Sequence, residues 1–343
     1  MNIERILIIG SGSIGSRHLY ICRNMFANAE IKIMHHAHSN AFENVDGGNL
    51  KSFGEAIDFK PNLTIIANPA TFHVESAQVL AENSSHLLIE KPISINSNNV
   101  GKLIQTCQSK NLILQVGYNL RFSASLRKYK EIITSGQIGE VYKIHCQAGQ
   151  YLPDWRPGTD YRRGVSARKD LGGGALLELS HEIDYLRWIF GEIRWVSGKL
   201  TKESDLEIDV EDTAHFKLGF KEILNSRQLV ADVRLDFTQK IPVRKCTASS
   251  DKVNLEWNGL SGEVTMIDKT LNTRKQVFID ELGLSKTYEY EWKSLAEAIN
   301  TGKKPLVTGV DGLRVIEIIE AIRKASSKGG KVEVVYDHSV IDK

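Results

Sequence analysis

Short, continuous apolar runs alternate with amphipathic segments in the first third of the chain. The runs lie at residues 5–10, 31–36, 63–68, 86–91 and 112–118, and the helix-like segments between them lie at 14–27, 52–58, 73–83 and 97–109. Uninterrupted apolar strands are typical of a parallel sheet that is covered on both faces. The alternation therefore predicts a doubly wound α/β domain over residues 1–122.

The pattern changes after about residue 122, where polar and apolar positions alternate with a period of two. Such segments lie at 139–149, 213–220, 227–237, 252–258 and 263–268, and helical stretches lie at 124–136, 176–191, 287–300 and 310–326. Alternation of this kind indicates an antiparallel sheet with one exposed face. Residues 123–343 are therefore predicted to form an α+β domain with a large, mostly antiparallel sheet.

Composition and charge narrow the function. The chain has 343 residues, enough for two domains, and a net charge of only +2, which gives no electrostatic reason to expect nucleic acid or a membrane surface. The four cysteines are scattered without a CxxC pair, which argues against a metal site or a disulfide framework. Neither a signal peptide nor an apolar run of about 18 residues is evident. We expect a cytoplasmic protein that acts on a small molecule.

A glycine-rich turn directly follows the first predicted strand. Gly10, Gly12 and Gly15 have GxGxxG spacing and open a helix, which is the context that gives this motif meaning. The helix N-terminus would supply N–H donors to a pyrophosphate. The alternative is a glycine turn without a ligand. We expect a dinucleotide to contact the whole turn, namely Gly10, Gly12, Ser13, Ile14 and Gly15.

The position that normally binds the adenosine ribose carries no acid. An NAD-selective site has Asp or Glu about 20 residues beyond the glycines. This chain has His35, His36, Ala37, His38 and Ser39 there. Histidine or serine could donate hydrogen bonds to a 2′-phosphate. Both NAD and NADP remain open, with NADP(H) favoured over NAD(H), unless the histidines only cap a solvated strand end.

Lys91 ends the fourth apolar run, in the sequence Glu90-Lys91-Pro92. In open α/β sheets, ligands bind outside the carboxyl ends of the strands. A lysine at that edge can reach a ligand and exchange a proton with it. The alternative is a salt bridge with a nearby acid.

A second candidate cluster lies in LGGGALLELSHEIDYLRWIFG, residues 171–191. Three glycines predict a flexible entry to a helix on which Glu178, His181 and Asp184 are spaced three apart, so that either acid has access to the histidine. A histidine beside a carboxylate can relay protons. The alternative is a structural histidine.

These motifs together resemble one known family. The segments are GSGSIGSRH at 10–18, EKP at 90–92, VGYNLRF at 116–122, GGGALLELSHEIDYLRW at 172–188 and KKPLVTGVDGLRVIEIIEAI at 303–322. In order and spacing they are similar to the glucose–fructose oxidoreductase, inositol dehydrogenase and MocA family over nearly the whole chain. The resemblance implies a Rossmann domain, a sheet domain that commonly forms the oligomer interface, and NAD(P)-dependent chemistry on a sugar or polyol hydroxyl.

The resemblance also implies roles for single residues. Lys91 would contact the nicotinamide ribose and the substrate, and His181 would act as an acid/base and contact the substrate. A constrained turn at Lys91-Pro92, for which a cis proline would fit, would aim the lysine. Further residues would line the cofactor, namely Asn68, Pro69, His73, Glu90 and Asn119.

One position departs from the family pattern. Many members carry an aspartate four residues before the histidine, whereas this chain has Glu178 three residues before His181. Whether Glu178 or Asp184 orients the histidine therefore stays open.

A loop over residues 151–174 precedes this helix and is rich in arginine and aromatic residues. Arginine binds carboxylate or phosphate with two hydrogen bonds, and aromatic rings stack on sugars. The loop predicts an anionic sugar as substrate, either a nucleotide sugar or an acidic sugar, and similar loops in bacterial surface-glycan enzymes agree by analogy. A solvated basic loop or a subunit contact is the alternative. The candidate substrate-binding residues here are Tyr151, Trp155, Arg156 and Arg163.

The sequence thus favours an NAD(P)-dependent oxidoreductase of a carbohydrate, acting as a homo-oligomer through its C-terminal sheet. The different-class alternative is a regulator that binds dinucleotide and sugar without turnover. The presence of both Lys91 and His181 argues against it.

Overall fold

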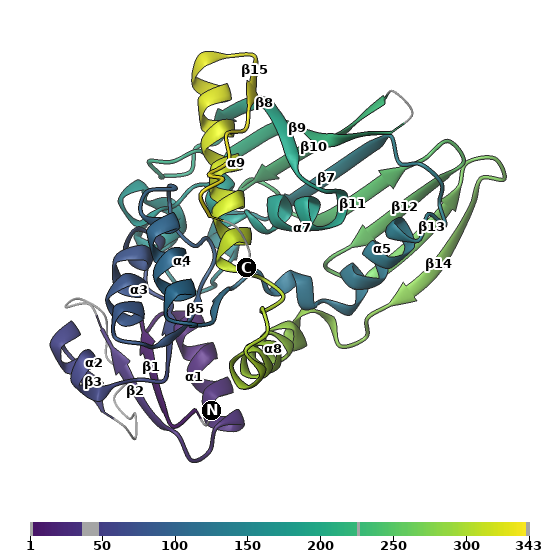
Figure 1. Ribbon diagram of the computed structural model, residues 1–343. Helices are drawn as coiled ribbons and strands as arrows, with labels where there is room; N and C mark the ends of the chain where they lie inside the picture. The colour runs from purple at the N-terminus through teal and green to yellow at the C-terminus, as the bar shows by residue number, and fades with distance from the viewer. Residues whose placement is uncertain (1–2, 36–47, 225–226, 341–343) are drawn as a thin grey trace. The chain divides into compact units, whose positions relative to one another are not determined.

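The computed structural model describes residues 3–35, 48–224 and 227–340 of the chain (Figure 1). These residues form two compact units. Unit 1 takes the described residues within Met1–Tyr118, Glu289–Ile316 and Asp337–Lys343, and unit 2 takes those within Asn119–Tyr288 and Glu317–Tyr336.

Unit 1 is built on a six-stranded parallel sheet of order β3-β2-β1-β4-β5-β6. This is the doubly wound order in which ligands bind where the strand order reverses, outside the strand ends. Every residue of β4 and β5 is buried, which explains why all but Thr64 and His86 are apolar. The strands are β1 (Arg5–Ile9), β2 (Glu30–Met34), β3 (Asn49–Leu50), β4 (Leu63–Ile66), β5 (His86–Ile89) and β6 (Leu114–Val116). The helices between them are α1 (Ser13–Met25), α2 (Phe53–Phe59), α3 (His73–Glu82) and α4 (Val100–Ser109).

Two later segments return to unit 1. The predicted division at residue 122 assigned everything beyond it to a second domain, but most of α8 (Thr287–Thr301) and the start of α9 (Gly309–Lys328) belong to unit 1. β6 is the last strand of the sheet, and an edge strand has backbone groups that no further strand of the sheet pairs with. The N–H of Val116 donates to the carbonyl of Val307 at 3.2 Å, and Gln115 pairs with Thr308. The returning chain therefore covers this edge.

Unit 2 contains a nine-stranded sheet of order β14-β13-β12-β11-β7-β10-β9-β8-β15. Only β7 and β10 pair in parallel among these neighbours, so the sheet is mostly antiparallel, as predicted. The strands are β7 (Lys143–Gly149), β8 (Ile193–Thr201), β9 (Thr213–Leu224), β10 (Arg227–Asp236), β11 (Val243–Ser249), β12 (Val253–Asn258), β13 (Glu263–Asp268), β14 (Thr273–Ile279) and β15 (Lys331–Glu333).

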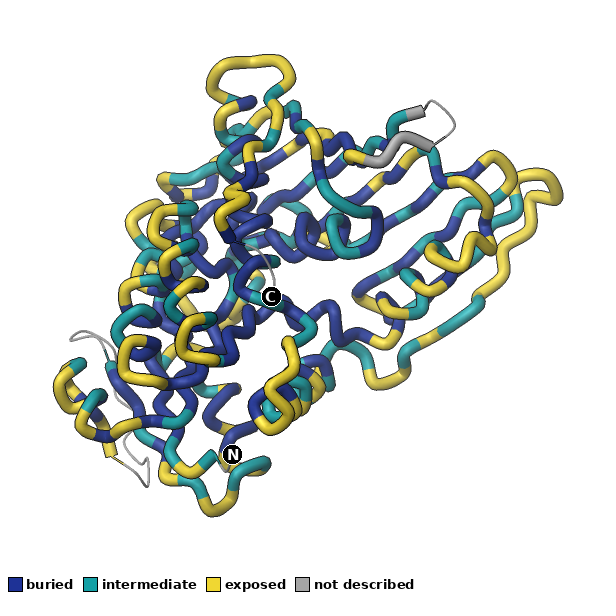
Figure 2. The backbone as a smooth tube through the Cα atoms, in the orientation of Figure 1, coloured by how far each residue is buried: buried dark blue, intermediate teal, exposed yellow. Residues whose placement is uncertain are grey.

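Helices α5 (Ala124–Thr134) and α7 (His181–Phe190) cover one face of this sheet (Figure 1). The indole N–H of Trp257 donates to Ser125 Oγ at 3.0 Å, and the Tyr185 ring meets the same indole edge-on at 5.3 Å. Edge strand β14 is mostly exposed (Figure 2). Assembly through this sheet stays a prediction.

The fold class predicted from the sequence is confirmed by these two sheets. Among the described residues, no helix combines the length and apolarity needed to cross a bilayer. In the same part of the chain, no group of three or more His, Cys, Asp or Glu residues is arranged to hold a metal ion.

The glycine turn provides a matched test of packing. A Cβ at Gly15 would collide with the carbonyl oxygen of Gly10, whereas a Cβ at Gly12 would meet nothing within 4 Å. Gly15→Ala is therefore expected to lower the free energy of unfolding by roughly 1–3 kcal/mol through overpacking. Gly12→Ala should stay within about 0.5 kcal/mol of wild type. Urea denaturation followed by circular dichroism measures both, and equal losses would contradict this assignment of the two glycines.

Candidate active site

The turn between β1 and α1 has the geometry that a pyrophosphate requires. Gly10 has a φ of +110° and donates its N–H to the carbonyl of Met34 at 3.0 Å. Gly12 is the exposed N-cap of α1, and Ser13 and Ile14 form its first turn. No acidic side chain lies in that first turn. An anion near the free N–H groups would meet no like charge there, so these residues fit the diphosphate of a dinucleotide.

The ribose position is only partly described. β2 ends at Met34, and the next residue, His35, has its Nε2 3.0 Å from Asn49 Oδ1. His36, a predicted cofactor ligand, lies outside the described residues, as do Ala37, His38 and Ser39.

His73 joins the carboxyl ends of β4 and β5. Its Nε2 lies 2.8 Å from the carbonyl oxygen of Asn68, and its Nδ1 lies 2.9 Å from that of Pro92. Burial lowers the pKa of His73, so a neutral ring donates to one carbonyl at a time. The Asn68 amide donates to Ser76 Oγ at 3.1 Å, and Pro69 follows it before α3 begins. The Lys91-Pro92 peptide bond, which precedes the carbonyl that this ring contacts, is cis.

Glu90 and Lys91 follow β5, and Glu90 turns inward. Its Oε1 lies 2.8 Å from His18 Nε2 on α1, and its Oε2 accepts the backbone N–H of Lys91 at 3.1 Å. The other side of the His18 ring accepts the indole N–H of Trp292, from α8, at 3.0 Å. A Cβ on Gly117 would come within 3.1 Å of Glu90 Oε2, so glycine leaves room for the carboxylate. Lys91 itself is half-buried.

Three predicted positions of unit 1 therefore meet at one edge of the sheet. Gly10, Asn68 and Lys91 follow the carboxyl ends of β1, β4 and β5, which are consecutive strands. Such an edge is where α/β sheets bind ligands.

In unit 2, the predicted continuous helix around His181 is interrupted. α6 (Ala175–Glu178) ends at Glu178, and α7 begins at His181. Between them, Ser180 bonds to Leu177 and Glu182 bonds to Leu179, three residues back instead of four. The i,i+3 argument that placed Glu178 beside His181 assumed one regular helix, so it does not apply across this break. His181 is buried at the first position of α7.

The glycines that precede α6 are constrained rather than flexible. A Cβ on Gly173 would collide with the backbone of Val165 and Ser166, and Gly174, at a φ of +107°, lies against the carboxylate of Glu211. That carboxylate also accepts the N–H of Leu176 at 3.1 Å. Close packing, not mobility, explains these glycines.

Asp184 forms a buried ion pair with Arg121. Both carboxylate oxygens accept from the guanidinium, at 2.9 and 2.6 Å. Arg121 and Asn119 belong to the short helix η2 (Asn119–Phe122), and the Asn119 amide donates to Thr287 Oγ1 at 2.8 Å. The pair joins η2 to α7. A role for Asp184 in orienting His181 stays a prediction, and Arg121 competes for both of its oxygens.

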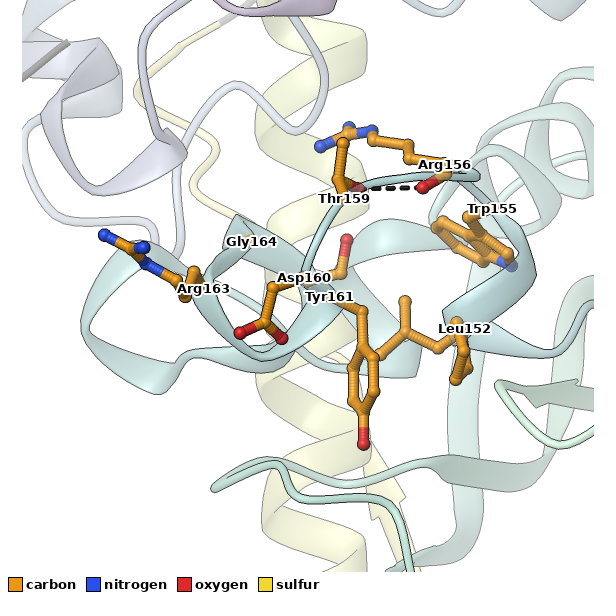
Figure 3. Close-up of a pocket in the computed structure, with 10 residues that line it drawn as sticks. Leu152, Trp155, Arg156, Thr159, Asp160, Tyr161, Arg163 and Gly164 are labelled. Atoms are coloured by element: carbon orange, nitrogen blue, oxygen red, sulfur yellow. Dashed lines mark hydrogen bonds between the residues drawn. The ribbon is translucent and has the colours of Figure 1, made fainter.

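The arginine-rich loop encloses a cavity of about 330 Å³ (Figure 3). Arg156 and Arg163, two of the predicted substrate ligands, line it, and Trp155 contributes to the wall. Other lining residues include Leu152, Thr159, Asp160, Tyr161 and Ser166.

The other arginines of the loop are neutralised by partners. Arg162 contacts Asp160 at 2.8 Å and Glu207 at 2.9 Å, and Arg168 pairs with Asp170 at 2.6 Å. Figure 3 shows Arg156 and Arg163 extending from the loop backbone. The charge most available to a ligand in this cavity is therefore that of Arg156 and Arg163.

The aromatic residues of the loop serve mainly as anchors. Trp155 packs edge-on against Phe237 at 5.2 Å and donates its N–H to the carbonyl of Gln150. Tyr151 has the ammonium group of Lys240 3.0 Å above its ring and does not line the cavity. Tyr161 packs against a small apolar cluster that includes Leu152 and Phe237. All three residues are half-buried, so part of each ring is engaged in packing, and stacking on a sugar stays a prediction.

Sequence reasoning missed three residues around Glu90. His18, Trp292 and Glu291 are all fully buried, and only the histidine lies within a recognised motif. Burial raises the pKa of Glu291 well above its ordinary value, and the nearby charge of Glu90 raises it further. Nothing in the local sequence of α8 distinguishes Glu291 from a solvated helix residue.

Comparison with known proteins agrees with this architecture. Three family models match successive parts of the chain. They are the oxidoreductase family NAD-binding Rossmann fold at residues 4–118, the GFO/IDH/MocA C-terminal domain at 126–237, and the oxidoreductase family C-terminal alpha/beta domain at 245–334.

Two relatives match along their full lengths. The uncharacterized oxidoreductase YrbE of Bacillus subtilis is 26% identical over 97% of this chain and 97% of its own. The myo-inositol 2-dehydrogenase of Thermotoga maritima is 26% identical over 96% of this chain and 98% of its own.

Two solved structures share the fold. Levoglucosan dehydrogenase in complex with NADH and levoglucosan has a TM-score of 0.82 at 20% identity, covering 97% of this chain and 100% of that one. The WlbA dehydrogenase from Bordetella pertussis, in complex with NADH and UDP-GlcNAcA, has a TM-score of 0.81 at 17% identity, covering 98% and 100%. With the three family models, the glycine turn and the two-sheet architecture, these findings establish that the chain belongs to the GFO/IDH/MocA family of NAD(P)-dependent oxidoreductases.

Proposed function

We propose that the protein transfers hydride between NADP(H) and a hydroxyl-bearing carbon of an anionic sugar derivative. The observation that carries the proposal is the convergence of the glycine turn, Asn68 and Lys91 at the carboxyl ends of three neighbouring strands. The full-length relative named myo-inositol 2-dehydrogenase supports a polyol or sugar as the substrate class.

In this proposal the residues of the chain manage the proton of the hydroxyl group. When bound, the nicotinamide supplies hydride chemistry at its C4 atom. Lys91 Nζ and the imidazole of His181 together bind the reacting oxygen and hold or accept its proton. Glu178 and Asp184 are the two carboxylates proposed to orient His181. Asn68, Pro69, His73, Glu90 and Asn119 shape the cofactor site around them.

Replacing Lys91 tests the catalytic part. Lys91→Ala should lower kcat by about 10²–10⁴-fold, because a group that handles the proton is lost. Binding of the reduced cofactor should persist. The rate at which NAD(P)H absorbance changes with a panel of sugars measures turnover, and Lys102→Ala, at an exposed lysine on α4, is the control. If wild type binds dinucleotide and sugar but turns over none of the panel, the protein is a sensing regulator instead.

His35 tests the cofactor preference. The residue follows β2, where an acid would bind the ribose 2′-hydroxyl of NAD and repel the 2′-phosphate of NADP. His35→Asp should shift the ratio of the two dissociation constants toward NADH by about tenfold or more. His35→Asn, which adds no charge, is the control. Fluorescence titration with both reduced cofactors measures the ratio, and tighter binding of NADH by wild type would refute NADP(H) preference.

The cavity arginines test the charge of the substrate. Arg156→Gln and Arg163→Gln should each raise KM for an acidic sugar by roughly tenfold, since each removes a charge-assisted contact. KM for the matching neutral sugar should hardly change. Arg168→Gln is the control, because Asp170 already engages that guanidinium. Equal effects on KM for the acidic and the neutral sugar would show that the arginines do not bind the anionic group of the substrate.

A further inference from the structure

A chain of buried hydrogen bonds links α8 to the turn that carries Lys91. The indole N–H of Trp292 donates to His18 Nδ1 at 3.0 Å, and His18 Nε2 lies 2.8 Å from Glu90 Oε1. Trp292 and His18 are fully buried, and Glu90 is 6% exposed. All of these residues belong to unit 1.

The chemistry of the indole fixes the direction of this chain. An indole nitrogen can only donate, so the His18 Nδ1 that faces it must carry a lone pair. The ring proton is then on Nε2 and is donated to Glu90. A doubly protonated ring would place two buried donors face to face across 3.0 Å, which would leave both without an acceptor. The short contact between His18 and Glu90 is therefore a hydrogen bond from a neutral ring rather than an ion pair.

Glu90 nevertheless carries its charge. Burial opposes its ionisation, but the hydrogen bond from His18 is the largest of the effects that hold the pKa of Glu90 below its ordinary value, and Lys91 adds to it. Both carboxylate oxygens also face a donor, which fits an ionised carboxylate. Its other oxygen accepts the Lys91 N–H at 3.1 Å.

The remaining titratable groups around Glu90 are neutral. Burial lowers the pKa of His73 on α3 and raises the pKa of Glu291 on α8. Neither group therefore supplies positive charge to Glu90 near neutral pH. With His18 and His73 neutral and Glu291 protonated, Lys91 supplies positive charge beside this carboxylate among the described residues of unit 1.

We propose that Trp292 is a positioning residue that locks His18 in its neutral Nε2–H tautomer and thereby reserves the negative charge of Glu90 for the ammonium group of Lys91. The inference deepens the proposed function, because it rests on Lys91 being the proton-handling residue. An anion directed at the lysine keeps the ammonium form available and holds it at the strand end. A protonated His18 would neutralise Glu90 and withdraw that field.

Nuclear magnetic resonance of the full chain tests the proposal without turnover. In wild type, ¹⁵N-labelled His18 should show the neutral Nε2–H tautomer throughout pH 5–9, within which free histidine titrates near about 6.5. In Trp292→Phe, which removes the donor but keeps a buried ring, His18 should gain a second proton within that range. The Lys91 ¹³Cε resonance should then respond to the His18 titration, whereas in wild type it should not. Trp257→Phe, which removes another buried indole N–H, is the control and should leave His18 unchanged.

Three results would overturn the proposal. They are an imidazolium or an Nδ1–H tautomer in wild type, a His18 that stays neutral in Trp292→Phe, and a Lys91 resonance that ignores the His18 titration in that variant. If Trp292→Phe does not fold, the wild-type tautomer decides the first half of the proposal. Glu90→Gln then decides the second half, since removing the carboxylate charge should shift the Lys91 ¹³Cε resonance.

Kinetics separate this inference from the proposed function. The pH profile of kcat/KM for Trp292→Phe should gain one ionisation that wild type lacks, with activity falling about threefold or more on its acidic side. If the His18 and Lys91 resonances behave as expected but no sugar is turned over, the proposed function alone is refuted. Turnover with identical pH profiles in both proteins would refute the role of Trp292 alone.

Discussion

The structure of unit 1 depends on keeping one carboxylate ionised inside the protein. Glu90 lies at the end of a strand whose residues are all buried, where a charge without partners would cost several kcal/mol. The surroundings remove that cost through a donor on α1, a backbone N–H and a lysine next in sequence. Gly117 leaves the necessary space. Residues on α1, in the turn after β5 and at Gly117 therefore all contribute to accommodating this one side chain.

Much of the fold could be predicted because periodicity is local. The runs at residues 5–10, 63–68 and 86–91 became β1, β4 and β5, since burial on both faces requires uninterrupted apolar residues. β3, β8, β11, β14 and β15 were not predicted, and β11 and β14 show why. In β11 the polar residues Arg244, Lys245 and Thr247 interrupt the few apolar ones. β14 is mostly exposed at the edge of the sheet. Neither strand has a strong alternation of apolar and polar residues, so hydrophobic periodicity does not predict them.

The candidate site also contains some residues that could be predicted from local sequence and others that could not. The glycine turn and Lys91 follow predicted strands directly, so their places were accessible from sequence. The partner of Asp184 was not, because Arg121 comes from a short helix 63 residues earlier. Trp292 lies 274 residues from the histidine that it contacts, a distance over which no local pattern carries information. The break before His181 also escaped prediction, because Leu179 and Ser180 are compatible with a regular helix.

The return of residues 289–316 to unit 1 has a consequence for synthesis on the ribosome. Translation proceeds from the N-terminus, so the first 118 residues emerge long before Val307 can cover β6 or an indole can reach His18. Until then the nascent sheet keeps an open edge, the feature by which unfinished chains recruit one another. Unit 1 therefore cannot be completed until nearly the whole polypeptide has been synthesised. An early translational stop would release an aggregation-prone fragment rather than an independent nucleotide-binding domain.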